Sequence, residues 1–144
     1  MQYLILNIEI LYCSLIIIVI KEAMDLQTSV KTCLSKYADF KGRAIRSEYW
    51  WFQLFAVIST FVAAIFDSFF VNNIDSAGPV EIIVSLGLLI PNLAVTARRL
   101  HDVNRSGWWM LIPITIIGII PYIIWVVTQG DGKKNRFGAA PKII

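Results

Sequence analysis

Long uncharged runs of apolar residues alternate with short charged clusters along this chain of 144 residues. The three main runs cover residues 49–66, 82–97 and 107–130. The first is long enough for a helix that crosses the apolar core of a bilayer, which takes about 17–25 residues. The second is short, but Arg98 and Arg99 at its end can extend toward the headgroups. The pattern predicts an all-α, helical integral membrane protein with three main hydrophobic segments.

The third run contains Pro113 and Pro121, and proline removes helical hydrogen bonds. It is therefore either one kinked span or a re-entrant pair of short helices. Basic clusters precede the first run and follow the second, whereas the segment 67–81 between them carries only acidic charges, so both clusters are expected to face the cytoplasm. A third full span would place the basic tail outside. Three alternatives remain: a re-entrant segment, a tail that crosses despite its charge, or a reversed orientation.

An amphipathic helix is predicted over residues 25–37, before the first run. Its apolar side chains share one face at helical spacing: Leu26, Val30, Cys33, Leu34 and Tyr37. Such a helix lies on the membrane surface or packs on the helical bundle, and we expect packing.

Residues 1–23 form a hydrophobic leader. A full span would bury Glu9 near the middle of the membrane, at a cost of about 2.5–3.5 kcal/mol. The leader has neither the basic start nor the cleavage site of a signal peptide. The leader is therefore either an extra N-terminal membrane helix or a mis-assigned start. In the second case the natural protein begins at Met24. Residues 24–144 are predicted to form a single helical membrane domain.

The composition agrees with a lipid environment. Hydrophobic residues make up 57% of the chain and charged residues 16%, against roughly 45–50% and 25% in soluble domains. The net charge is +3, and basic residues stand near the ends of the apolar runs, where anionic lipid headgroups attract them. The aromatic residues lie inside the runs rather than among the charges, which disfavours nucleic acid as a partner. Cys13 and Cys33 belong to no C-x-x-C or His–Cys pattern, so we expect two unpaired thiols.

The first charged segment is FKGRAIRSEYWW, residues 40–51. Gly42 allows a turn, and Arg43 and Arg46 share a face if the segment is helical. Glu48 suits the positive N-terminus of the helix that follows. The segment either anchors the chain at the interface or binds an anionic headgroup.

The second charged segment is RRLHDVNRSGWW, residues 98–109, which we interpret as a short loop. It holds three arginines, the only histidine, His101, and Asp102. The loop either anchors the chain through an ion-pair network with Glu48 or allows His101 to respond to pH.

The third segment is the tail GDGKKNRFGAAP, residues 130–141. Its glycines suit turns, and it lacks the residue order of a phosphate-binding loop, so we expect a tail folded back on the headgroup region. The sequence contains no recognisable nucleophile–base pair and too few clustered ligands for a metal ion. We predict no catalytic, cofactor-binding or metal-binding residues and a non-enzymatic protein.

Taken in order, these three segments resemble the YhaH/YhaI-like family of small bacterial inner-membrane proteins, a domain of unknown function (DUF805). The resemblance covers about residues 24–141 and rests on Phe40, Gly42, Arg43, Arg46, Glu48, Tyr49, Trp50, Pro91, Arg98, Arg99, Leu100, His101, Asp102, Ser106, Gly107, Trp108, Gly130, Gly132, Asn135, Gly138 and Pro141. It implies a multi-pass protein of the bacterial inner membrane and implies no activity. The family pattern does not call for the leader.

The candidate functional cluster has seven members at the predicted cytoplasmic edge: Arg43, Arg46, Glu48, Arg98, Arg99, His101 and Asp102. We expect the two carboxylates to neutralise the arginines, because unpaired arginines are costly to bury. The leading hypothesis is a protein that binds anionic lipid or a partner protein through this cluster. The alternative is a small oligomeric transporter or channel, with kinks at its prolines and His101 as a proton site. Either protein could form a homo-oligomer.

Overall fold

The computed structural model describes residues 24–70 and 78–141, so both predictions for the leader lie outside the described residues. Every named element among the described residues is a helix, which confirms the all-α prediction for them. The elements are α2 (Leu26–Ser35), α3 (Arg46–Phe70), α4 (Pro79–Asp102), the 3₁₀ helices η1 (Gly107–Ile114) and η2 (Ile116–Gly118), and α5 (Ile119–Val127). Two of them, α3 and α4, are long and apolar enough to cross a membrane.

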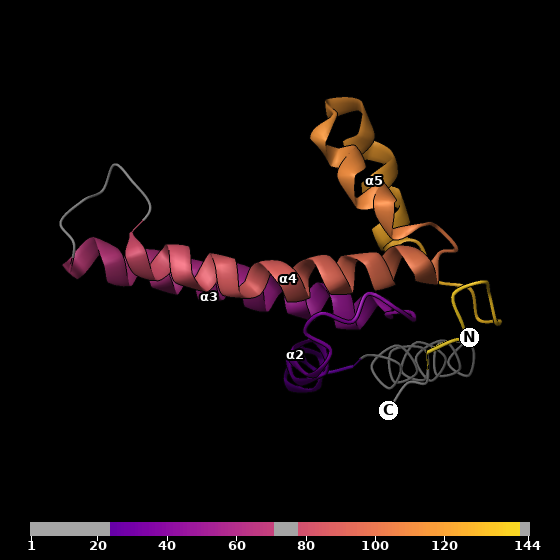
Figure 1. The fold of residues 1–144 in the computed structure, drawn as a ribbon, viewed down its shortest axis with the longest axis horizontal. Coiled ribbons are helices and arrows are strands. Elements are labelled where there is room, and N and C mark those ends of the chain that lie inside the picture. The colour runs from indigo at the N-terminus through magenta and orange to yellow at the C-terminus, as the bar shows by residue number, and fades with distance from the viewer. Residues whose placement is uncertain (1–23, 71–77, 142–144) are drawn as a thin grey trace, which may run out of the picture.

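Helices α3 and α4 run side by side in opposite directions and form the long axis of the molecule (Figure 1). Small side chains lie buried along the pair, among them Ala56, Ala63 and Ala94, and they let the two backbones approach closely. Halfway along, the Gln53 amide donates a hydrogen bond of 2.9 Å to the Asn92 carbonyl oxygen. This bond satisfies two polar groups that an apolar surrounding would otherwise penalise.

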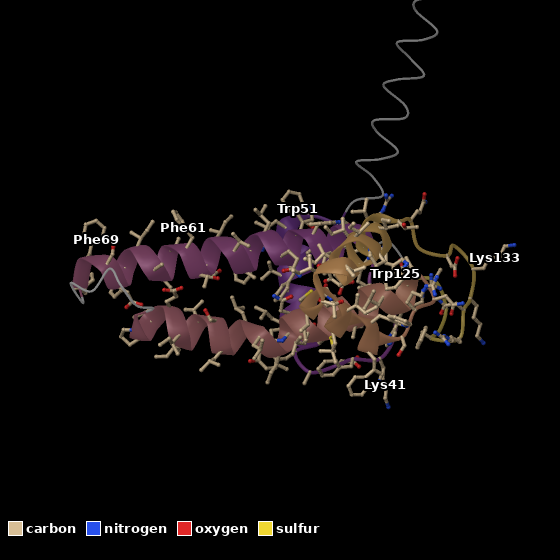
Figure 2. The ribbon with its side chains drawn as sticks, turned by 90° about the horizontal axis from the view of Figure 1, so that it is seen from above. Lys41, Trp51, Phe61, Phe69, Trp125 and Lys133 are labelled. Carbon is tan, nitrogen blue, oxygen red and sulfur yellow. The ribbon has the colours of Figure 1, made fainter. Side chains whose placement is uncertain are left out.

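The outer surface of the pair is apolar. Side chains such as Phe61 and Ile83 are 66% and 69% exposed, and Figure 2 shows Trp51, Phe61 and Phe69 pointing away from the ribbon. In contrast, Arg98 and Arg99 are among the largest side chains that are fully buried. A protein in water buries its apolar residues and exposes its arginines. This reversed distribution suits a chain whose solvent is lipid.

Asp67 joins the C-terminal end of α3 to the first turn of α4. Its carboxylate is buried and accepts hydrogen bonds from the backbone N–H groups of Val80 (3.3 Å) and Glu81 (2.8 Å), in the first turn of α4. These groups have no partner within the helix, and a negative charge suits this end of it. A methyl group on Gly78 would overlap the Asp67 carboxyl group, so the contact requires glycine there.

The third hydrophobic run is a hairpin of short helices rather than one kinked helix. Elements η1, η2 and α5 project together from the α4 C-terminal end, steeply inclined to the long pair (Figure 1). Gly118 at the bend packs so closely on Ile112 that no larger residue fits. The chain then returns to its starting point, where Asp131 N–H donates to Asp102 O at 3.1 Å. The run therefore begins and ends at the same end of the α3–α4 pair.

Helix α2 packs across α3 and α4 through one narrow face. Cys33 and Ser29 are buried there, whereas Leu26 and Leu34 of the predicted stripe are exposed. The Tyr37 hydroxyl, just beyond the helix, donates to the Gly87 carbonyl oxygen at 2.6 Å. The packing role is confirmed, but the predicted apolar face is only partly buried.

One boundary prediction is wrong. Residues Arg98 to Asp102 were expected in a loop, but they form the last turn of α4, which also continues through Pro91. Basic side chains are favourable near a helix C-terminus, where the helix dipole is negative. These charges also find partners inside the protein, so they do not require the chain to leave the helix.

Candidate functional site

Five charged side chains form a buried group at the C-terminal end of α4, which we call the ionic cluster: Arg43, Glu48, Arg98, Arg99 and Asp102. All five are between 0% and 6% exposed. They come from the loop before α3, the first turn of α3 and the last two turns of α4. The structure thus brings together five of the seven residues that the sequence singled out.

Asp102 is the centre of this cluster. Its Oδ1 accepts a hydrogen bond of 2.9 Å from Arg43 Nε, and its Oδ2 accepts one from Arg99 Nη1. Arg99 precedes Asp102 by three residues in α4, a spacing that places both side chains on one face of a helix. One carboxylate therefore neutralises a loop arginine and a helix arginine together.

Glu48 and Arg98 form the second buried pair, with 2.8 Å between Glu48 Oε1 and Arg98 Nη1. The Cys33 thiol from α2 donates to the same carboxylate oxygen at 3.8 Å. Burial raises the pKa of the Cys33 thiol to about 12, and the Glu48 charge adds to this effect. Cys33 is therefore a neutral thiol at physiological pH and ties α2 to α3.

Three arginines face two carboxylates in the cluster, which leaves one positive charge in excess. Backbone carbonyl oxygens compensate for it. Arg99 donates to Val126 O at 3.1 Å and also to Thr128 O, at the C-terminus of α5. Carbonyl oxygens at a helix C-terminus lack intrahelical partners and carry partial negative charge. Arg99 thereby fixes the returning arm of the hairpin to α4.

Arg43 holds the tail in the same way. Its guanidinium donates to Lys133 O at 2.7 Å and also to Asp131 O. Gly130 lies against the Asp102 carboxylate so closely that a methyl group there would overlap it. The cluster therefore clamps residues 126–133 onto the α4 end. Its donors are directed at protein acceptors rather than at the surface, except Arg98 Nε, which is buried and has no hydrogen-bond partner among the described residues.

The remaining two predicted residues lie outside the cluster. Arg46 is exposed at the start of α3 and forms no ion pair among the described residues. The expected common face of Arg43 and Arg46 does not form, because α3 begins only at Arg46. Gly42, with φ of +82°, instead turns the loop so that Arg43 points inward.

His101 is half-buried beside the cluster. Its Nδ1 lies 3.1 Å from Gly42 O, and its ring stacks on Phe137 with 3.9 Å between centroids and 9° between planes. The Asn135 side chain donates to His101 O at 2.8 Å. The histidine thus joins the loop before α3 to the tail.

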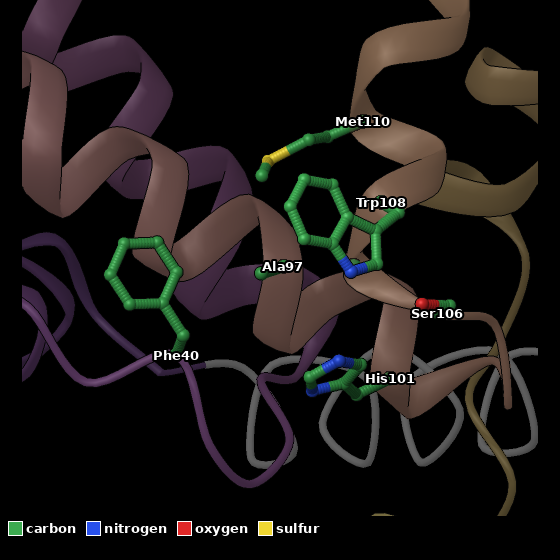
Figure 3. A pocket seen from close by; sticks show the side chains of 7 residues that line it. Phe40, Ala97, His101, Ser106, Trp108 and Met110 are labelled. Atoms are coloured by element: carbon green, nitrogen blue, oxygen red, sulfur yellow. The ribbon is translucent and has the colours of Figure 1, made fainter.

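A pocket of about 330 Å³ opens next to His101 (Figure 3). Its lining comes from the loop before α3, the last turns of α4 and the start of η1: Phe40, Ala97, His101, Ser106, Gly107, Trp108 and Met110. Its volume is at the lower end of the roughly 300–1,000 Å³ typical of small-molecule sites. The pocket could not be predicted from the sequence, because it needs Phe40 from the loop before α3 to meet residues 97–110.

Sequence reasoning also missed the cap formed by Asp67 and the backbone acceptors in residues 126–133. Asp67 ends an apolar run and is followed by a glycine–proline pair at 78–79, a combination that can mark a capped helix start. The acceptors have no comparable signature, because every residue carries a carbonyl group.

The chain is similar to known inner membrane proteins. The family model "Protein of unknown function (DUF805)" matches residues 37–139. The chain is 38% identical to inner membrane protein YhaH of Escherichia coli strain K12 over 112 residues, which are 76% of this chain and 93% of that protein. It is 36% identical to inner membrane protein YhaI of the same strain over 115 residues, 76% of this chain and 91% of that protein. No solved structure matches the chain.

Proposed function

The chain belongs to the DUF805 family of inner membrane proteins, and from this premise we propose that it is a non-enzymatic membrane protein that binds anionic lipid at the cytoplasmic surface. The observation that carries the proposal is the position of its cations. No lysine or arginine occurs between residues 47 and 97, which include most of the α3–α4 pair. In Figure 2, Lys41 and Lys133 both lie at the end that holds the ionic cluster.

Six exposed basic residues, from the loop before α3, the start of α3, the loop after α4 and the tail, make up what we call the basic end: Lys41, Arg46, Arg105, Lys133, Lys134 and Arg136. Each Lys or Arg near an anionic membrane surface contributes about 1 kcal/mol of attraction. The positive-inside rule places such residues in the cytoplasm. The returning hairpin supports the same side for the tail, because its start and finish are joined at Asp102.

We assign lipid binding to the basic end, and not to the cluster of charged residues that the sequence suggested. The arginines of the cluster donate to carboxylates and carbonyl oxygens of the protein, so a lipid phosphate would have to displace these bonds. The cluster instead holds the loop before α3, the α4 end and the tail in one arrangement. That arrangement presents the exposed cations together.

The proposal is tested with purified protein in a neutral detergent. Thermal unfolding is followed while phosphatidylglycerol, phosphatidylserine or phosphatidylcholine is added. Both anionic lipids should raise the Tm, and phosphatidylcholine should not. The gain should fall at high salt and in a variant with Lys41, Lys133 and Lys134 all changed to Gln, since exposed charges are screened. Equal gains from anionic and zwitterionic lipid would contradict the proposal.

A small oligomeric transporter or channel is the competing hypothesis. The polar side chains halfway along the α3–α4 pair, Gln53 and Asn92, bond to each other, so a passage would need a second copy of the chain. Solute flux into proteoliposomes that is lost on His101→Ala would favour this alternative.

A further inference from the structure

The pocket beside His101 lies where the apolar surface of the molecule meets its charged end. Phe40, Ala97 and Met110 form an apolar wall on one side. Trp108 is 77% exposed at the opening. Polar groups stand at the other side of the same space, on His101, Ser106 and Trp108 (Figure 3). A pocket with one polar and one apolar side suits an amphiphilic ligand rather than a fully polar solute.

The hydrogen bond of His101 determines what the pocket can accept. A carbonyl oxygen only accepts hydrogen bonds, so the 3.1 Å contact with Gly42 O requires a proton on Nδ1. In the neutral ring, Nε2 then carries a lone pair. This nitrogen faces Gly107, where an added methyl group would come within 3.4 Å of it. Because position 107 has no side chain, Nε2 stays open to a donor in the pocket.

Two donor side chains line the same pocket as this acceptor. Figure 3 shows the indole nitrogen of Trp108 on the side of the ring toward His101, and Ser106 lines the same pocket. The Ser106 side chain forms no capping bond with η1, although it occupies the N-cap position. A hydroxyl group could donate to His101 Nε2 and accept from the indole N–H or the serine. The three groups thus match an alcohol.

A cation lies next to the pocket, outside its lining, and donates to Asn104 O at 3.1 Å. The Arg136 guanidinium lies 4.6 Å from the centre of the Phe137 ring, and that ring stacks on His101. Lys41 is exposed in the loop that carries Phe40. A phosphate next to the bound hydroxyl would therefore meet positive charge, while an acyl chain would continue over the apolar wall.

We infer that this pocket binds the headgroup of a glycerol-headed phospholipid, with the free hydroxyl on His101, Ser106 and Trp108 and the phosphate near Arg136. The inference rests on the proposed function and deepens it from attraction by charge to recognition of one headgroup chemistry. The cations of the basic end would attract any anionic lipid. The pocket would select those that carry a free hydroxyl beside the phosphate.

The test compares two anionic lipids that differ in headgroup chemistry. Binding of phosphatidylglycerol and of phosphatidylserine to the detergent-solubilised protein is measured by native mass spectrometry, with phosphatidylcholine as the uncharged reference. The protein should bind phosphatidylglycerol about tenfold more tightly than phosphatidylserine, the effect of one to two additional hydrogen bonds. The double variant Ser106→Ala/Trp108→Phe removes both hydrogen-bond donors and keeps an aromatic ring at position 108. It should lower the affinity for phosphatidylglycerol to that for phosphatidylserine and leave the latter unchanged.

The matched control is Trp109→Phe, which changes the neighbouring indole outside the pocket and should keep the preference. Equal binding of the two anionic lipids by the native protein would overturn the pocket assignment and leave the proposed function standing. A preference that survives the double variant would overturn the pocket assignment as well. Failure of both anionic lipids to bind better than phosphatidylcholine would overturn the proposed function itself.

Discussion

Replacing Asp102 with Asn tests the ionic cluster most severely. Asn has nearly the shape of Asp and still offers one acceptor oxygen, but it carries no charge. The substitution would leave Arg43 and Arg99 buried without the carboxylate that they share. The backbone bond between Asp131 N–H and Asp102 O would remain, so the effect reports the loss of charge.

The expected magnitude follows from the burial of these groups. Removing one partner of a buried ion pair costs about 3–5 kcal/mol, because the other charge stays buried without compensation. Asp102 is 3% exposed and serves two arginines, so we expect about 4 kcal/mol. Folded domains are stable by about 5–15 kcal/mol in total. The variant should therefore lose a large part of its stability, with a fall in Tm of roughly 10 °C.

The assay is thermal unfolding in a neutral detergent, followed by circular dichroism. The control is Asp131→Asn, which makes the same chemical change on an exposed side chain of the tail and should alter stability by less than about 0.5 kcal/mol. If the two variants unfolded within about 1 kcal/mol of each other, the cluster would not stabilise the fold in the way described.

Three further predictions each depend on a single contact: two concern substitutions and one concerns the reactivity of a thiol. Gly130→Ala should displace the tail, because its methyl group would overlap the carboxylate on which the glycine packs, and limited proteolysis should then cleave the tail faster. Asp67→Ala should lower the free energy of unfolding by about 1 kcal/mol through loss of the α4 cap, measured by the same thermal assay. Cys33, in a Cys13→Ser background, should resist a maleimide at pH 7 until the protein is denatured, because its thiol is buried and its pKa is raised to about 12.

Each of these predictions has a matched comparison. Gly132→Ala meets open space and should leave proteolysis unchanged, so equal cleavage of the two glycine variants would refute the packing argument. Asp67→Asn keeps an acceptor for the α4 amides and should retain most of the stability, so equal losses in Asp67→Asn and Asp67→Ala would refute the role of these hydrogen bonds. Rapid labelling of Cys33 in the folded protein would show that α2 does not stay packed on α3.

The long helices could be predicted because their cause is local. An uncharged run of suitable length gives each helix of the α3–α4 pair almost directly. The two prolines of residues 107–130 left one kinked span and a pair of short helices as alternatives, and the sequence did not decide between them. The end of α4 could not be placed, since Arg98 to Asp102 look like a polar loop until their partners are known. Those partners are 27 to 59 residues away in the sequence.

The sequence predicted most of the residues of the ionic cluster, but it did not predict how they are arranged. Arg43 and Arg46 look equivalent in the sequence, and only the start of α3 at Arg46 separates a buried arginine from an exposed one. Four of the cluster's acceptors are backbone carbonyl oxygens of residues 126–133, which residue types do not reveal. The pocket depends on the same tertiary contacts, because it forms only when the loop, α4 and η1 meet.

The central claim is that both basic segments and the tail share one side of the membrane. It is tested by substituted-cysteine labelling in a background with Cys13→Ser and Cys33→Ala. Single cysteines at Lys41, Lys134 and Pro79, all exposed, are reacted with an impermeant maleimide in intact cells and in inverted vesicles. Positions 41 and 134 should react only in inverted vesicles, and position 79 only in intact cells. Labelling of position 134 from the side opposite to position 41 would contradict it.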